Sequence, residues 1–133
     1  MAAITDLDEL LKSLHPELSD IEYVFCSVTL DLCECLAFNP LATFREAEGL
    51  SLVVRREVAQ QAQLEYEGTF RLITLGVHSS LEAVGLTAAV AGRLAARGIS
   101  ANVIAACFHD HILVPADRAD EAITELKELS PGP

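Results

Sequence analysis

Three side chains that can bind a metal ion follow one another near the end of the chain, at His109, Asp110 and His111. Residues two apart on a β-strand point to the same face, so both imidazoles could reach one ion. A zinc ion would still need at least one further ligand from elsewhere in the fold. The other interpretation is a polar turn between two strands at a sheet edge. We expect the turn and no metal site, and we keep metal binding by His109 and His111 as the alternative.

Small and polar residues also precede the most regular helical pattern of the sequence. Ser79 and Ser80 supply hydroxyl groups, and Gly85 would let a ligand approach the backbone closely. The unpaired N–H groups at the start of a helix carry partial positive charge and suit a carboxylate. Asn102 lies in an otherwise apolar strand, where its amide needs a partner in the backbone or in a ligand. The alternative is that a serine caps the helix and the glycine permits close packing.

Two pairs of residues have the chemistry of a nucleophile and its base, Cys107 with His109 and Ser80 with His78. A nucleophile needs a base within hydrogen-bond reach and a third group that orients the base. Closeness along a strand is a chance arrangement, and the sequence contains neither a nucleophile elbow nor a phosphate-binding loop. We therefore expect a protein that is not an enzyme and that needs no cofactor.

The charge balance excludes several classes of partner. The 133 residues include 20 acidic and nine basic side chains, for a formal charge of −11, and the basic residues do not cluster. Nucleic acid and anionic membrane surfaces are bound by concentrated Lys and Arg, so neither is expected as a partner. No uncharged run approaches the roughly 20 residues of a membrane span. The acidic N-terminal segment is unlike a signal peptide, and we expect a cytoplasmic protein with reduced cysteines.

Apolar periodicity predicts the helices that must position these groups. Leucines at helical spacing predict a first helix, which Thr5 can cap. Small apolar residues predict a longer helix over 82–97, and Gly98 is suited to end it. The last helix is expected to begin at Asp117, a good capping residue, and a shorter helix is expected over 55–63.

Strands are predicted from short runs of β-branched, aromatic and other apolar residues. They are expected over 21–28, 33–38, 50–54, 70–77, 100–108 and 111–114, the last two joined by a turn at His109 and Asp110. From residue 69 onward the order is strand, helix, strand, strand, helix, and a right-handed crossover would place both helices on one face of a sheet. Such a sheet needs a fourth strand from upstream, so the two halves of the chain are expected to interlock.

The stretch VHSSLEAVGLTAAVAGRLAARGISANVIA, residues 77–105, resembles an ACT domain. ACT domains are small βαββαβ ligand-binding modules found in the regulatory regions of amino-acid biosynthetic enzymes. With FREAEGLSLVV before this stretch and HDHILVP after it, the chain resembles a group of small stand-alone bacterial proteins with two ACT-like units. That group is similar to the regulatory regions of aspartate kinases and to cytosolic arginine sensors.

The resemblance implies an α+β fold of two interlocked ferredoxin-like βαββαβ units, with antiparallel sheets and helices on one face. The C-terminal ACT domain is expected over 67–130. The N-terminal ACT-like unit is expected over 1–66, with an incomplete unit and a strand-exchanged unit as the alternatives to a complete one. ACT sheets commonly extend edge to edge, so the resemblance also implies a homodimer.

The function that the resemblance implies is that of a non-catalytic regulatory or sensor protein that binds a small molecule, expected to be an amino acid. The ligand-binding residues that follow from it are Ser79, Ser80, Val84, Gly85, Leu86, Asn102, His111 and Arg45. Arg45 would pair with a carboxylate. Asn102 stands where aspartate-kinase-type sites often have an aspartate that pairs with the ligand's ammonium group. The alternatives are a protein–protein interaction module without a ligand, and the metal-binding protein considered above.

Overall fold

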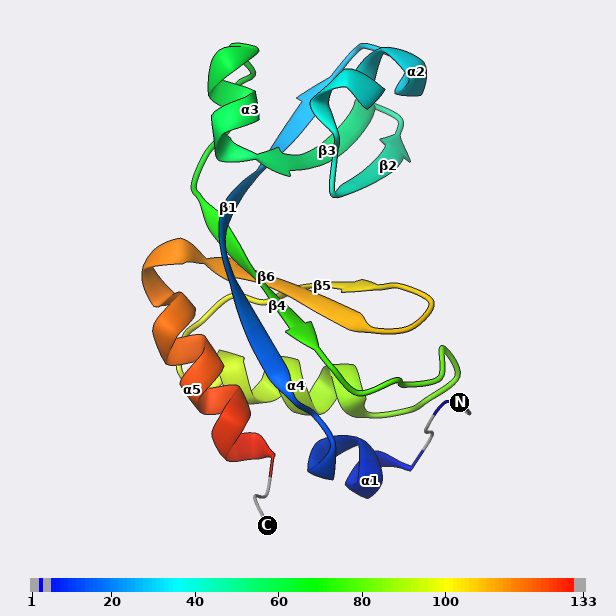
Figure 1. Cartoon of the computed structure of the whole chain (residues 1–133), viewed down its shortest axis with the longest axis vertical. Coiled ribbons are helices and arrows are strands. Elements are labelled where there is room, and N and C mark those ends of the chain that lie inside the picture. Colours follow the sequence, from blue (N-terminus) through cyan, green and yellow to red (C-terminus); the bar gives the residue numbers. More distant parts are fainter. Residues whose placement is uncertain (1–2, 4–5, 131–133) are drawn as a thin grey trace. The chain divides into compact units, whose positions relative to one another are not determined.

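The computed structural model describes residue 3 and residues 6–130, and these form two compact units. The large unit combines the chain up to Asp20 with the chain from Arg71 onward, and the small unit is Ile21–Phe70. Strand β1, Pro16–Val28, belongs to both units, because its first five residues lie in the large one (Figure 1). The start of the chain is therefore part of the same unit as its end, as the expected interlocking of the two halves requires.

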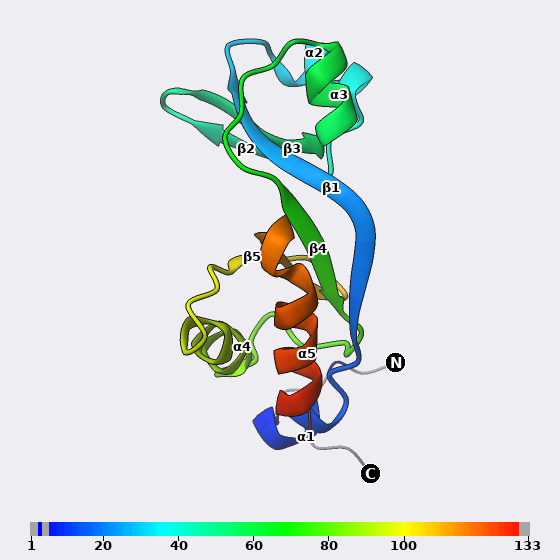
Figure 2. The ribbon, with the colours of Figure 1, turned by 90° about the vertical axis from the view of Figure 1, so that its left-hand side faces the viewer.

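The large unit is a sheet with three helices packed against it (Figure 2). Its strands lie in the order β1, β4 (Phe70–Leu75), β6 (Asp110–Pro115) and β5 (Asn102–Ala105), and β5 pairs antiparallel with β6. Its helices are α1 (Leu7–Lys12), α4 (Leu86–Ala95) and α5 (Ala119–Leu129), and the 3₁₀-helix η2 (Ala116–Arg118) precedes α5. The core includes apolar side chains from all three helices, from the connection after α1, and from β4 and β6: Leu10, Leu14, Ile73, Leu75, Leu86, Val90, Leu94, Ile112, Val114 and Leu126.

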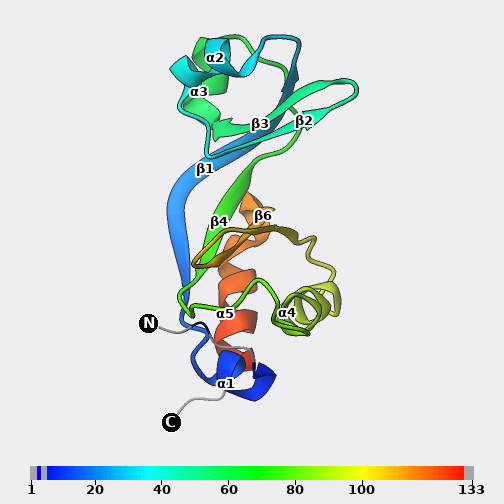
Figure 3. The same ribbon diagram turned by 90° about the vertical axis from the view of Figure 1, so that its right-hand side faces the viewer.

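The small unit repeats this plan with shorter helices (Figure 3). Its strands lie in the antiparallel order β2 (Ala42–Glu46), β3 (Gly49–Arg55) and the rest of β1. Its helices are α2 (Leu32–Cys35), the 3₁₀-helix η1 (Leu36–Phe38) and α3 (Arg56–Gln61). Cys35 of α2 and Ala59 of α3 join one core cluster with Val24, Cys26, Leu50, Leu52 and Val54, so both helices cover the same face.

Side-chain alternation along the strands separates two faces of the large-unit sheet. Ile73 and Ile112 belong to the core beneath the helices, whereas their neighbours Thr74 and His111 point to the helix-free face and contact each other there. Helices thus cover one face of the sheet in each unit. Together with the antiparallel strand pairs, this arrangement confirms the expected α+β fold.

The segment 33–38, expected to be a strand, is helical instead and forms the end of α2 and all of η1. Asp31 Oδ1 accepts a hydrogen bond from the N–H of Glu34 at 2.9 Å, and Glu34 Oε1 accepts one from the N–H of Asp31 at 3.2 Å. This reciprocal pair is a capping box, which begins a helix. Alternation over six residues could not separate a strand from a single turn of helix. The strand β2 that follows was not expected.

Two helix caps differ from the expected ones. The cap of α1 is Asp6, whose carboxylate accepts a hydrogen bond from the N–H of Asp8 at 2.9 Å, and Thr5 lies outside the described residues. Asp117 lies inside η2, and no side chain caps α5. At the end of α4, Gly98 has a φ of +70°, as expected of the glycine that follows a helix.

The turn between the last two strands spans residues 106–109 and is longer than expected. The N–H of Ala106 donates to the carbonyl of His109 at 3.1 Å, and Asp110 pairs with Ala105 across the ladder. Asp110 is therefore a strand residue and not a turn residue. The physical reason is that tight two-residue hairpins favour glycine or asparagine at positive φ, and this stretch offers neither.

Candidate ligand-binding site

The loop between β4 and α4, residues 76–85, makes hydrogen bonds to His15 and within itself. At its start, the N–H of Gly76 donates to the carbonyl of His15 at 3.0 Å. Farther along, the Ser80 carbonyl accepts from the N–H of Ala83 at 3.0 Å, and the Ser80 hydroxyl accepts from the N–H of Glu82 at 3.1 Å. Ser80 thus closes a turn within the loop and does not cap α4.

Side-chain contacts join this loop to the hairpin of β5 and β6. The hydroxyl of Ser79, which is 7% exposed, donates to Asp110 Oδ2 at 2.9 Å. The ring of His78 lies against the ring of Phe108, with centroids 5.4 Å apart. The serine-containing loop and the His-Asp-His run are therefore parts of one site, although they are far apart in the sequence.

Helix α4 follows this loop, and among the described residues no side chain caps the start of the helix. Gly85 occupies the N-cap position with a φ of +100°, a conformation that favours glycine, and it has no side chain with which to cap the helix. The first turn contains no acidic residue, and within the described part of the chain no side chain accepts a hydrogen bond from its N–H groups. Leu86 is buried in the core, so it offers the site only its backbone N–H. Such an N-terminus suits an anionic group.

Gly85 has a structural role as well, because it lies against the first helix. A Cβ atom built on Gly85 would be 3.2 Å from Cδ2 of Leu7. Before Gly85 the loop presents apolar side chains to solvent, since Leu81 is 70% and Val84 is 82% exposed. Phe108 in the hairpin turn is 65% exposed.

His111 and Asn102 are placed on the helix-free face of the sheet, away from the start of α4. His111 Nδ1 is 3.0 Å from the hydroxyl of Thr74, and burial lowers the pKa of His111 below its ordinary value. The amide of Asn102 donates to the carbonyl of Leu113, its partner on β6, at 3.2 Å. The backbone therefore provides the partner that the Asn102 amide needs.

Arg45 lies in the small unit, on strand β2, and lines a surface cavity of about 280 Å³. The other lining residues come from the connection between β1 and α2 and from the hairpin of β2 and β3: Leu30, Asp31, Leu32, Glu46, Gly49 and Leu50. Among the described residues, Arg45 has no ion-pair partner. The predicted ligand residues are thus divided between three places: the start of α4, the helix-free face and this cavity.

No three His, Cys, Asp or Glu side chains of the described residues converge as a metal site would require. The imidazole of His111 instead contacts Thr74, and Asp110 accepts from Ser79. Cys33 and Cys35 of the C-x-C pair differ in environment, the first exposed and the second buried.

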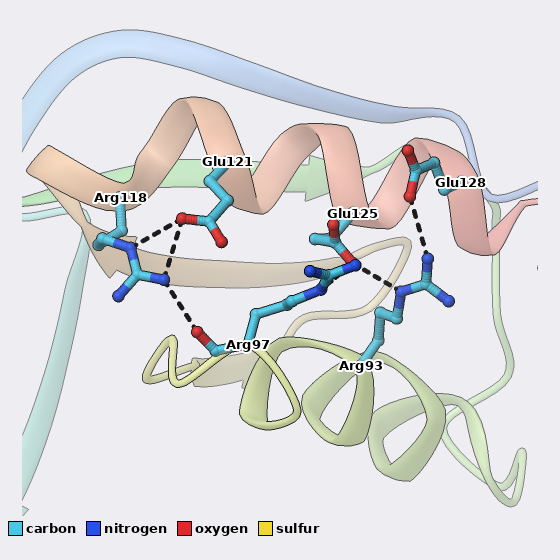
Figure 4. A network of polar contacts seen from close by, with 6 residues as sticks. All are labelled: Arg93, Arg97, Arg118, Glu121, Glu125 and Glu128. Atoms are coloured by element: carbon cyan, nitrogen blue, oxygen red, sulfur yellow. Dashed lines mark hydrogen bonds and ion pairs between the residues drawn. The ribbon is translucent and has the colours of Figure 1, made fainter.

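Two carboxylates have roles that the sequence did not indicate. The first is Asp110, expected in a turn and found bonded to the loop before α4. The second is Glu125 of α5, which is 6% exposed and accepts hydrogen bonds from Arg93 at 2.9 Å and from Arg97 at 3.2 Å (Figure 4). The bond from Arg93 is the main cause of a pKa of Glu125 below its ordinary value. Glu125 thereby ties α4 to α5. The only sequence signal was the placement of Arg93 and Arg97 on one edge of α4.

Two models of the ACT domain match the sequence, one over residues 2–71 and the other over residues 67–128. The chain belongs to the ACT domain family. This confirms the family expected from the sequence, over both halves of the chain. ACT domains are regulatory modules, so the membership supports a ligand-binding regulatory role for this protein. No curated protein matches the sequence.

Solved structures share the fold of this ACT domain protein. A Vibrio cholerae protein of unknown function, described as a possible transport protein, is 54% identical, with 94% of this chain and 96% of that one aligned at a TM-score of 0.87. The ligand-free regulatory subunit of Thermus thermophilus aspartate kinase is 11% identical, with 89% and 98% covered at a TM-score of 0.67. E. coli aspartokinase III in complex with aspartate and ADP is 14% identical, with 89% and 34% covered at a TM-score of 0.65. At these low identities the likeness to the two kinases is one of fold.

Proposed function

We propose that the protein is a non-catalytic sensor that binds a free amino acid at the start of α4. One observation carries this proposal: an uncapped helix N-terminus follows a loop that Ser79 holds against the carboxylate of Asp110. A free amino acid has one carboxylate and one ammonium group. The helix N-terminus suits the first group and the aspartate suits the second.

The carboxylate of the ligand would bind the backbone N–H groups of the first turn of α4. These groups carry partial positive charge, and the turn has no acidic side chain that would repel an anion. Ser80, Val84 and Gly85 belong to the loop that leads into this turn, with Gly85 at the N-cap position. Val84 is exposed and free to cover a ligand side chain.

Asp110 would supply the negative charge that Asn102 lacks. Ser79 bonds to Oδ2 of Asp110, which leaves Oδ1 open to a donor such as an ammonium group. The amide of Asn102 is bonded to the backbone of β6 and carries no charge, so a charged partner for the ammonium group has to come from another residue. His111 and Asn102 would then act indirectly: their contacts with Thr74 and with the backbone of β6 would hold in place the strands that form the site.

The first experiment is a thermal-shift screen of chelator-treated protein against the twenty amino acids at millimolar concentration, with zinc in a separate well. Ligand at ten times its Kd stabilises the native state by about 1.4 kcal/mol, so even a weak ligand is detected. A shift with one amino acid or a few related ones is expected. A shift with zinc alone would support the metal alternative, and no shift with any of them would support the interaction module without a ligand.

The Asp110→Asn variant then tests the site with the amino acid that gives the largest shift. The substitution keeps the shape of the side chain and an oxygen for Ser79, but it removes the charge. We expect affinity measured by calorimetry to fall about tenfold to a hundredfold, as for the loss of a charged hydrogen bond. The matched control is Asp117→Asn, which removes an equal charge from an exposed position in the same unit. Equal affinity in the two variants would contradict the assignment of Asp110.

The remaining expectations belong to the same proposal. We propose a homodimer, because β2 and β5 are the edge strands of the sheet order and β2 carries Phe44, which is 72% exposed. The ACT units at 1–66 and 67–130, a cytoplasmic location and a lack of affinity for nucleic acid stay predictions. No helix in the described part of the chain is long and apolar enough to cross a membrane. Sedimentation with and without ligand tests the dimer, which a monomer under both conditions would contradict.

A further inference from the structure

A second cavity of the small unit, of about 260 Å³, lies where β3 ends and α3 begins. It is separate from the cavity beside Arg45, and no predicted ligand residue lines it. The residues that line it are Ile21, Glu22, Arg55, Arg56, Glu57 and Gln60. Two arginines and two glutamates thus surround a space smaller than the pockets that hold drug-sized ligands.

The second of the two arginines is held by the protein itself. Arg56 Nη1 donates to Glu22 Oε1 at 2.9 Å. A hydrogen bond with Tyr66, followed by the pairing with Glu22, raises the pKa of Arg56 above its ordinary value. The amide of Gln60 reaches the same Tyr66 hydroxyl at 3.4 Å. These contacts link the cavity residues Arg56 and Gln60 to Tyr66, near the end of the small unit. Few N–H groups of Arg56 remain available to a ligand.

Arg55 is different, because its guanidinium is largely unused. Its ion-pair partner among the described residues is Glu57, at 3.9 Å, beyond hydrogen-bond distance. The side chain of Arg55 is 46% exposed and that of Glu57 is 72% exposed. For comparison, Arg93 of the large unit holds two glutamates at 2.9 and 3.1 Å. Arg55 therefore has several N–H groups available, directed by a planar fork that matches a carboxylate.

We propose that this cavity is a second binding site for a small zwitterion, with the ligand's carboxylate on Arg55 and its ammonium group on Glu57. A zwitterion matches the adjacent positive and negative charges of Arg55 and Glu57. A simple anion would be repelled by Glu22 and Glu57. The carbonyl oxygen of Gln60 is a further acceptor for the ammonium group. The site lies wholly within the small unit, so it does not depend on the site proposed at α4.

The experiment is an NMR titration of the whole chain with glycine, the smallest amino-acid zwitterion, and separately with acetate and with methylammonium. The signals observed are the Nε–H of Arg55 and the backbone amides of Arg56, Glu57 and Gln60. We expect glycine to shift them with an affinity at least tenfold higher than that of either half-molecule. Acetate as effective as glycine would show an anion site and overturn the proposal, as would glycine that leaves these signals unmoved.

Three variants test this site and separate it from the first one. Arg55→Gln should abolish the glycine response of the small unit, and it should not disturb the fold, since the side chain is half exposed and its one ion pair with a described residue is the 3.9 Å contact with Glu57. Lys127→Gln, which removes one positive charge from an exposed position of α5, should leave the response unchanged. Asp110→Asn should also leave it unchanged, so that failure of the α4 site and failure of this site are distinguishable. A glycine response that survives in Arg55→Gln would overturn the proposal.

Discussion

The helix that follows β1 in the small unit and the helix that follows β4 in the large unit differ in how their first turn is capped. In the small unit, the connection from β1 to α2 is residues 29–31, and the helix begins with a capping box formed by Asp31 and Glu34. In the large unit, the connection from β4 to α4 is residues 76–85, and the helix begins at Gly85 without any side-chain cap. The N-terminus of α2 is thus satisfied by the protein's own carboxylate, whereas within the described part of the chain no side chain accepts from the N-terminus of α4.

The hairpin of β2 and β3 and the hairpin of β5 and β6 also differ, in the partner to which a carboxylate is bonded. In the small unit, the carboxylate of Glu46 accepts a hydrogen bond from Ser51 within its own hairpin. In the large unit, the carboxylate of Asp110 accepts a hydrogen bond from Ser79 in the loop before α4. One hairpin is bonded to itself and the other is bonded to the loop. Two units of one family thus share a fold, while among the described residues only α2 of these two helices begins with a side-chain cap.

The largest expected effect follows from Gly85. In Gly85→Ala the φ of +100° becomes unfavourable and the new methyl group meets Leu7, so we expect a loss of about 1–3 kcal/mol in the free energy of unfolding, measured with urea. The matched control lies in the same helix: a Cβ on Gly92 would meet nothing within 4 Å, and Gly92→Ala should leave stability unchanged or raise it by up to about 1 kcal/mol. Equal effects of the two substitutions would contradict the assigned role of Gly85.

A smaller effect is expected when the closed helix start of the small unit is opened. Asp31→Ala removes the capping box and should cost about 0.5–2 kcal/mol of unfolding free energy, measured in the same urea titration. Asp117→Ala is the comparison, because Asp117 was expected to cap a helix and its side chain does not do so. Its effect should be within about 0.5 kcal/mol. A larger loss in Asp117→Ala than in Asp31→Ala would reverse the assignment of the caps.

The smallest effect concerns the helix-free face of the large unit. Burial lowers the pKa of His111, so the unfolded chain binds a proton more readily than the native protein does. This contribution to stability is present above the ordinary histidine pKa of 6.5 and is lost as the pH falls through the lower pKa of the folded protein. Melting temperatures should therefore decline on acidification from pH 7 toward 5, and less so in His111→Gln. An identical decline in the variant would assign the effect to other groups.

Local patterns were sufficient where a long element has one apolar face. The periodicity of 82–97 predicted α4 and its terminal glycine, and the runs at 21–28 and 70–77 lie on β1 and β4. The motif in 77–105 was sufficient to identify the family, because it combines a strand, a small-residue loop and a helix in one continuous stretch. Where the element is a single turn, as at 33–38, the local pattern was ambiguous, and the capping box at Asp31 decided it.

By itself, therefore, the sequence determined the family, the main elements, the presence of a loop with serines and a glycine before α4, and the exclusion of a highly basic surface. Only the tertiary structure decided which polar groups meet. Asp110 and Ser79 are 31 residues apart in the sequence, and the register of β6 brings them together while turning His111 to the opposite face. The physical reason is the two-residue period of a strand: a shift of one position exchanges the faces, and that position is fixed by pairing with distant strands.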